Sequence, residues 1–194
     1  MLPEPATPTP IADEDLMLRV QSSDEAAFAE LMGRWELPVK SVIARLVLNA
    51  SEAEDLAQEA FVRLWQHRAK FQAGRRFKPW LLGIAVNLAR NRLRWWRHRP
   101  TVALDEWMEE PGSNASEAGA AGLERAEQAQ TVRDAIAGLP HDYREALVLF
   151  EYEELSYQEI AELVGASAKV VENRIARGRA KLKAALGALR ESRP

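Results

Sequence analysis

Residues 155–186 read LSYQEIAELVGASAKVVENRIARGRAKLKAAL, and this stretch decides the fold of the C-terminal part of the chain. Ser156 and Glu159 have the spacing of a capping box, which starts a short helix whose apolar residues recur at helical spacing. Gly165 provides a turn, and a second helix begins near residue 168. Two such helices joined by a glycine turn predict a helix-turn-helix.

The second helix of this motif has one apolar face and several polar ones. Four apolar residues fall on a single stripe, which we expect to be buried: Val171, Ile175, Leu182 and Leu186. Asn173 can pair with adenine in a major groove, and Arg177 can meet a phosphate or a guanine. Helical hairpins also occur in proteins that never touch DNA, but the basic second helix favours DNA binding.

Arg174 borders the apolar stripe, and the sequence leaves two roles open for it. It can form an ion pair with Glu159 on the preceding helix, or it can contact a DNA phosphate.

The rest of the chain also has helical periodicity, and strand-like alternation is missing. Ser22 and Ser51 each precede a glutamate by three residues, which predicts capping boxes at two helix starts. Pro79 fits the first turn of a helix that runs to about Arg97. The sequence therefore predicts an all-α protein.

Composition divides the chain into a tail, two small helical domains and a linker. Residues 1–12 are rich in proline and predict a disordered tail. Residues 100–122 collect Pro, Gly, Ser, Asn and five acids, which predicts a flexible linker. The domains then span residues 13–99 and 123–194, and we expect each to fold independently.

The net charge of −3 conceals a strong asymmetry along the chain. Residues 60–99 contain eleven Lys or Arg and no acid, residues 100–170 contain four basic and fifteen acidic residues, and residues 171–194 contain seven basic and two acidic residues. Two separate basic surfaces could thus touch nucleic acid, although such charge runs are also typical of solvated helix faces.

Several classes of function are disfavoured by what the chain lacks. It has no cysteine and three scattered histidines, so the sequence offers no thiol nucleophile, disulfide framework or zinc cluster. It has no signal peptide pattern and no apolar run of membrane-spanning length. We expect a cytoplasmic protein that is not an enzyme, binds no cofactor and does not insert into a membrane.

The basic stretch at residues 60–99 also contains seven of the fourteen aromatic residues. Cations interleaved with aromatics suit single-stranded nucleic acid. Phe61, Trp65 and Trp80, however, have apolar neighbours, which favours a place in the core over base stacking. Trp95 and Trp96 are the better candidates for contact. On the helix after Pro79, polar residues share one stripe opposite the apolar residues: Asn87, Asn91, Arg94 and His98.

A short polar patch precedes the basic stretch. Asp55, Gln58 and Glu59 lie opposite the apolar side of their helix, where a protein partner could reach them. Taken alone, such a patch is more typical of a solvated helix face.

Three of these segments together resemble the extracytoplasmic-function (ECF) family of bacterial sigma factors. Residues 55–65, DLAQEAFVRLW, and residues 80–87, WLLGIAVN, are similar to region two of that family, and the helix-turn-helix segment is similar to region four. The matches cover residues 13–99 and 131–186 in the family's order. The resemblance implies a subunit that binds core RNA polymerase, recognises the minus-ten and minus-thirty-five promoter elements and helps to open the DNA.

The resemblance also implies roles for individual residues and partners. Asp55, Gln58 and Glu59 would dock on the clamp of the largest polymerase subunit, and region four would bind the second-largest subunit. The implied minus-ten contacts are Phe71, Arg75, Arg76, Lys78, Asn87, Arg90, Asn91 and Arg94. The implied minus-thirty-five contacts are Lys169, Glu172, Asn173, Arg174, Ala176, Arg177 and Lys181. The acidic linker would thread the RNA exit path, and an anti-sigma factor is an expected partner.

Two segments depart from the family pattern. Lys169, Val170 and Glu172 replace residues usual at the start of the recognition helix, and residues 73–76, AGRR, replace a segment that is usually acidic and contains serine. Because a carboxylate can accept a hydrogen bond from cytosine, we expect an unusual minus-thirty-five preference. The main alternative is an operator-binding regulator, which would bind duplex DNA without polymerase.

Overall fold

The computed structural model describes residues 11–98 and 130–191, and every regular element in these two ranges is helical. The N-terminal helices are α1 (Asp13–Gln21), α2 (Glu25–Val47), α3 (Ala50–His67), the 3-10 turn η1 (Arg68–Lys70) and α4 (Phe77–Arg97). Residues 130–137 are helical, and α6 (His141–Leu147), the π-helical turn η2 (Val148–Tyr152), α7 (Tyr157–Val164) and α8 (Ala168–Glu191) follow. The all-α prediction is confirmed, whereas residues 1–10 of the predicted tail and the whole predicted linker lie outside the described residues.

Helix starts follow their capping side chains, and two of the predicted capping boxes are wrong. The Asp24 carboxylate accepts a hydrogen bond from the Ala27 N–H and caps α2, while the Asn49 side chain accepts from the Glu52 N–H and caps α3. Ser22 instead ends α1, and Ser51 lies inside the first turn of α3. Asp and Asn cap helices as well as Ser does, and here Asp24 and Asn49 take the capping positions instead of Ser22 and Ser51.

The predicted capping box of the C-terminal motif is confirmed. The Ser156 hydroxyl accepts from the Glu159 N–H at 3.2 Å, and the Glu159 carboxylate accepts from the Ser156 N–H at 2.9 Å. Gly165 ends α7 in the left-handed conformation with φ 68°, which a side chain would disfavour. The two helices of the predicted helix-turn-helix are therefore α7 and α8.

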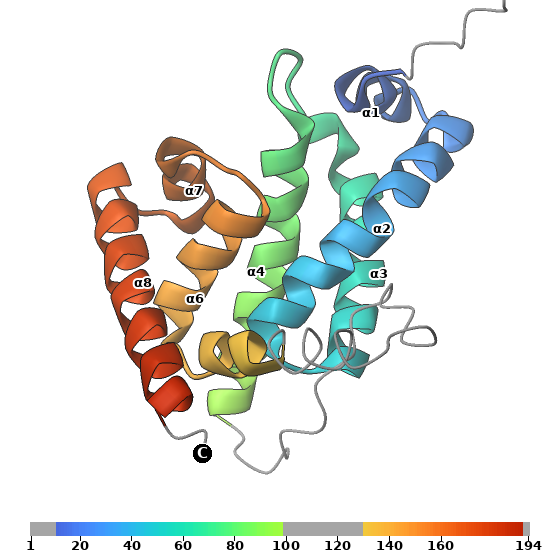
Figure 1. Ribbon diagram of the computed structural model, residues 1–194. Helices are drawn as coiled ribbons and strands as arrows, with labels where there is room; N and C mark the ends of the chain where they lie inside the picture. Colours follow the sequence, from blue (N-terminus) through green and yellow to red (C-terminus); the bar gives the residue numbers. More distant parts are fainter. Residues whose placement is uncertain (1–10, 99–129, 192–194) are drawn as a thin grey trace, which may run out of the picture.

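Helix α4 is the centre of the described structure (Figure 1). It packs against α2 and α3 on one side and against α7 on the other. Its buried face includes Leu81, Ala85 and Leu88, which join one continuous apolar cluster that extends from α1 to α8. The helices of the two predicted domains thus contact one another, and α4 packs against helices of both.

None of the helices within residues 11–98 and 130–191 combines the length and the apolar character that crossing a membrane requires.

Candidate polymerase and nucleic-acid interfaces

The polar patch on α3 lies on the outside of the N-terminal helices. Leu56, Ala60 and Leu64 are buried on the inner face of α3, which turns Asp55 and Gln58 to solvent. Glu59 is half-exposed and forms an ion pair with Arg63 one turn later, at 2.6 Å. These three polar side chains are therefore accessible to a protein surface.

An apolar hollow adjoins this patch and was not found from the sequence. It encloses about 590 Å³ and is lined by Phe28, Phe61, Trp65, Gln58 and others. Val62 stands at its edge with 54% of its surface exposed. In the sequence, Val62 follows Gln58 by one helical turn and so lies on the polar side of the helix, which could have indicated this hollow. A single exposed valine is common on soluble proteins, however, and does not by itself indicate a site.

The loop before α4 is anchored by its aromatic residues. Phe71 is only 3% exposed, and its ring contacts the rings of Phe77 and Trp80 edge-on, with centroids 6.3 and 5.3 Å away. The structure therefore places Phe71 inside the apolar cluster, although the resemblance implied a DNA contact. Arg75 and Arg76 at the tip of the loop are exposed.

Two polar side chains of α1, which the sequence did not single out, hold this loop in place. The Gln21 amide donates to the carbonyl oxygens of Arg68 and Phe71, at 3.0 and 2.6 Å. The Glu14 carboxylate accepts from the Phe77 N–H at 2.8 Å, which satisfies a free donor at the start of α4. Hydrogen bonds from α1 therefore hold both ends of the loop that carries Arg75 and Arg76.

The predicted polar stripe on α4 is at the surface. Asn87, Asn91 and Arg94 are all exposed, and they point away from the buried Leu88 and Ala85. Trp95 is 45% exposed, whereas Trp96 is half-buried and packs against the core. A nucleic-acid strand that follows α4 would therefore meet two amides and a cation in succession.

Arg90 does not share the exposure of this stripe. Its Nε donates to Oε1 of Glu145 at 2.6 Å, and its Nη2 donates to Oε2 of Glu145 at 2.5 Å. The hydrogen bonds that Arg90 donates to the Glu145 carboxylate raise the pKa of Arg90 above its ordinary value. Arg90, which is predicted to contact the minus-ten element, thus forms an ion pair with a carboxylate of α6.

Helix α8 separates a buried from an exposed face as expected. Val171 and Ile175 are buried, and Leu182 and Leu186 are partly buried. The exposed residues are Lys169, Glu172, Asn173, Ala176, Arg177 and Lys181. Lys169 and Glu172 form an ion pair at 2.8 Å, which offsets the negative charge that Glu172 would present to DNA.

Arg174 forms an ion pair with Asp142 of α6 at 2.8 Å, so the predicted partner, Glu159, is wrong. Glu159 is engaged elsewhere, because it closes the capping box of α7 and pairs with Arg76. Asp142 precedes Arg174 by 32 residues, and only the packing of α6 against α8 brings the two together.

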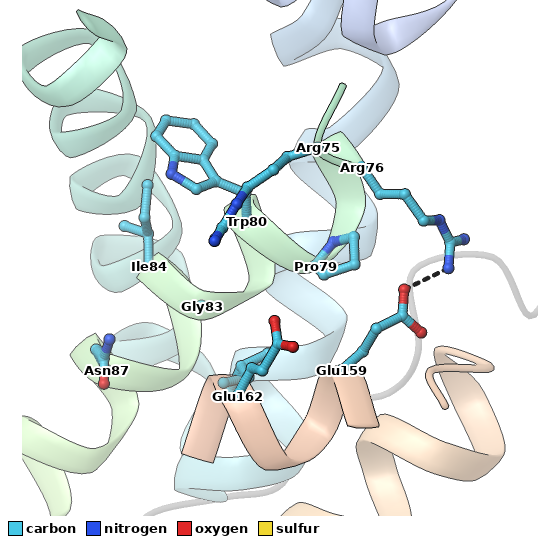
Figure 2. Close-up of a pocket in the computed structure, with 10 residues that line it drawn as sticks. Arg75, Arg76, Pro79, Trp80, Gly83, Ile84, Asn87, Glu159 and Glu162 are labelled. Carbon is cyan, nitrogen blue, oxygen red and sulfur yellow. Dashed lines mark hydrogen bonds and ion pairs between the residues drawn. The ribbon is translucent and has the colours of Figure 1, made fainter. Parts of the chain in front are cut away.

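A cavity of about 630 Å³ lies between α4 and α7 (Figure 2). Arg75, Trp80 and Asn87 line it from the N-terminal side, and Glu159 and Glu162 line it from α7. Figure 2 shows the Arg76 guanidinium and the Glu159 carboxylate pointing toward one another, joined by an ion pair. Within the described ranges, no three His, Asp or Glu side chains converge as a metal site requires.

Comparison with known proteins assigns both halves of the chain. Residues 31–99 match the family model of Sigma-70 region 2, and residues 129–182 match that of Sigma-70, region 4. The RNA polymerase sigma factor CarQ of Myxococcus xanthus is 37% identical over 173 residues, which cover 89% of this chain and 97% of CarQ. The ECF RNA polymerase sigma factor SigW of Bacillus subtilis is 32% identical over 182 residues, 85% of this chain and 91% of SigW.

A solved structure has the same fold. CnrH, determined in complex with the cytosolic domain of CnrY, superimposes with a TM-score of 0.67 and 29% sequence identity, covering 92% of this chain and 99% of CnrH. Sequence and structure agree, and the chain belongs to the ECF family of RNA polymerase sigma factors.

Proposed function

We propose that this sigma factor directs transcription initiation through three separate surfaces. The α3 patch binds core RNA polymerase, the outer stripe of α4 with the loop before it binds the minus-ten element, and the exposed face of α8 binds the minus-thirty-five element. The observation that carries the proposal is the outer stripe of α4, where Asn87 and Asn91 are exposed opposite a fully buried apolar face.

The chemistry of each surface fits its proposed partner. The α4 stripe follows a loop with two exposed arginines, and such a mixture of amides, cations and nearby aromatic rings suits a melted strand. The α8 face presents Asn173 and Arg177 on a helix that has the dimensions of a major groove reader. The α3 patch is acidic and amidic, which disfavours nucleic acid and suits a basic protein surface.

An anti-sigma factor is the proposed regulator. A promoter-binding subunit has exposed DNA and polymerase surfaces that must be covered when transcription is not wanted. CnrH was solved with the cytosolic domain of CnrY bound, which supports the same kind of partner for this chain.

The test is reconstitution with purified core RNA polymerase. We expect the full chain to co-purify with core enzyme and to select promoter sequences from a random duplex library only when core enzyme is present. Tight, sequence-specific duplex binding by the chain alone, without association with core enzyme, would identify an operator-binding regulator and refute the proposal.

A further inference from the structure

The first turn of α8 presents one large apolar side chain to solvent. Val170 is 41% exposed, and it is not among the described residues that pack on the apolar cluster. Single exposed valines are common on soluble proteins, but a β-branched residue at an exposed helix position also costs helix stability relative to alanine. Packing within the described ranges therefore does not account for a valine at this position.

The neighbours of Val170 fix the direction in which it points. Val171 and Ile175 are buried, and they hold the opposite side of α8 against the rest of the protein. The Ser167 hydroxyl accepts a hydrogen bond from the Val170 N–H at 3.3 Å and caps the start of the helix. Because a valine in a helix has one strongly preferred rotamer, its exposed methyl groups keep a fixed direction.

Val170 lies on the same face of α8 as two residues of the proposed minus-thirty-five surface. Asn173 and Arg177 follow it by three and seven positions, and all three side chains are exposed. Val170 is the third residue of α8, and a recognition helix contacts base edges with its N-terminal residues. Three residues of helix rise about 4.5 Å, close to the separation of about 3.4 Å between successive bases on a strand. Val170 and Asn173 would therefore face the same base pair or neighbouring ones.

The two cations beside Val170 have acidic partners of their own. Lys169, the preceding residue, forms an ion pair with Glu172 at 2.8 Å. Arg174, one turn further on, forms an ion pair with Asp142 of α6 at 2.8 Å. Val170 stays exposed next to both pairs, and its methyl groups are open to an apolar partner.

The chemistry of the major groove selects that partner. Thymine is the only base that offers an apolar group there, its C5 methyl, and this group can pack against the methyl groups of a valine. The other three bases present hydrogen-bonding groups at the same edge, and a valine would leave them unpaired at a cost in free energy. An exposed valine among groove-reading residues therefore favours thymine and disfavours the other bases.

We propose that Val170 is a specificity-determining residue of the minus-thirty-five surface. It contacts the C5 methyl group of a thymine within one base pair of the base that Asn173 contacts. The inference rests on the proposed function of α8, and it adds a residue that the implied set of minus-thirty-five contacts does not include.

The first experiment uses the complex of the full chain with core RNA polymerase. The upstream element is selected from a random duplex library, and each thymine of the selected element, on either strand, is then replaced in turn by uracil. This replacement removes one methyl group and keeps every hydrogen-bonding group of the base. Binding of each duplex is measured for the wild type, for Val170→Ala and, as a control at a neighbouring groove-reading position, for Asn173→Ala.

We expect replacement of one thymine to weaken binding of the wild-type complex by about threefold to fivefold, as for the loss of one buried methyl group. The same replacement should leave binding by Val170→Ala unchanged and should keep its full effect on Asn173→Ala. The proposal is overturned if every thymine methyl that matters to the wild type matters equally to Val170→Ala, if none matters, or if the selected element contains no thymine.

The second experiment adds a methyl group instead of removing one. At the position of the sensitive thymine, a duplex with cytosine is compared with a duplex that carries 5-methylcytosine, which differs only by the C5 methyl. We expect the methylated duplex to bind the wild-type complex about threefold more tightly and to bind Val170→Ala no better than the unmethylated one. Equal gains for the two proteins, or no gain for the wild type, would contradict the methyl contact.

Folding does not confuse these comparisons, because position 170 is exposed and alanine is a better helix former than valine. Circular dichroism melting verifies that Val170→Ala is folded. The proposed function fails separately from the inference. A complex that selects no upstream sequence refutes the minus-thirty-five assignment of α8, whereas a selected element that is indifferent to thymine methyl groups refutes only the role of Val170.

Discussion

Arg90 of α4 and Glu145 of α6, 55 residues apart in the chain, form a two-point ion pair in which both carboxylate oxygens accept from one guanidinium. The pair joins the proposed minus-ten helix to the helices that precede the helix-turn-helix. Arg90 is therefore both a member of the proposed minus-ten set and a residue that joins the two halves of the chain.

The first prediction concerns the α3 patch. Glu59→Lys should weaken binding to core polymerase by about tenfold or more, because it places a cation against the basic polymerase surface that the acidic patch is proposed to bind. Stability should change little, since the ion pair with Arg63 is half-exposed on both sides. Asp15→Lys, at an exposed acid of α1, is the control, and core binding by titration is the measurement. Wild-type affinity of the Glu59→Lys variant would refute the assignment.

The second prediction concerns promoter opening. Asn87→Ala and Asn91→Ala should slow transcription from a duplex promoter and have much less effect on a promoter whose minus-ten region is already melted. The reason is that these exposed amides are proposed to hold the strand that melting releases. Run-off transcription on the two templates gives the comparison. If the defects are the same on both, the two residues do not act chiefly in opening.

The third prediction separates two residues on α8. Arg177→Ala should weaken binding to upstream duplex DNA. If the guanidinium contacts a phosphate, the substitution should also reduce the slope of log K against log salt concentration by about one. Asn173→Ala should change the preferred sequence instead, because a two-point base contact discriminates by roughly 1–3 kcal/mol. Binding of the polymerase complex to promoter libraries at several salt concentrations tests both. Identical effects of the two substitutions would contradict this division.

The fourth prediction concerns pH. Burial lowers the pKa of His141 below 6.5, and Arg144 and Arg90 add to this against the opposing attraction of Glu145 and Asp142. Because the unfolded chain then binds more protons than the folded chain, stability is highest above the ordinary histidine pKa and falls as the pH decreases.

Melting midpoints measured from about pH 7.5 to about pH 5.5 should therefore fall more steeply for the wild type than for His141→Gln. Arg97 lines the same cavity as His141. Parallel slopes for the two proteins would show that His141 is not the titrating group.

The fifth prediction concerns the packing of α8 on α6. A Cβ atom at Gly178 would lie 2.7 Å from Cδ1 and 3.1 Å from Cγ of Leu147. Gly178→Ala should therefore destabilise the protein by about 1–2 kcal/mol, because the overpacking exceeds the gain in helix propensity. Gly187→Ala, where nothing lies within 4 Å, should instead stabilise it by up to about 1 kcal/mol. Denaturant titration compares them, and equal stabilisation would mean that the helices do not approach so closely.

Local signals predicted the helices and the outward direction of most proposed site residues. The helix-turn-helix was readable because its capping box, its glycine turn and its apolar stripe all lie within 32 consecutive residues. The polar stripe of α4 and the patch on α3 were readable for the same reason, since a helix places residues three and four apart on one face. Periodicity does not distinguish between capping residues a few positions apart, and the starts of α2 and α3 were accordingly misassigned.

Tertiary packing decided which of those surface residues are free. Phe71 follows a polar segment and carries no periodic signal, so only the rings of Phe77 and Trp80 around it show that it is buried. Arg76 and Glu159 are 83 residues apart, and no spacing rule connects them. Helical periodicity is set by hydrogen bonds between near neighbours in the chain, and it can therefore be predicted from the sequence. Contacts between the two halves depend on how whole helices dock. The ion pairs of Arg76, Lys78 and Arg90 with glutamates of the C-terminal half are therefore visible only in the folded structure.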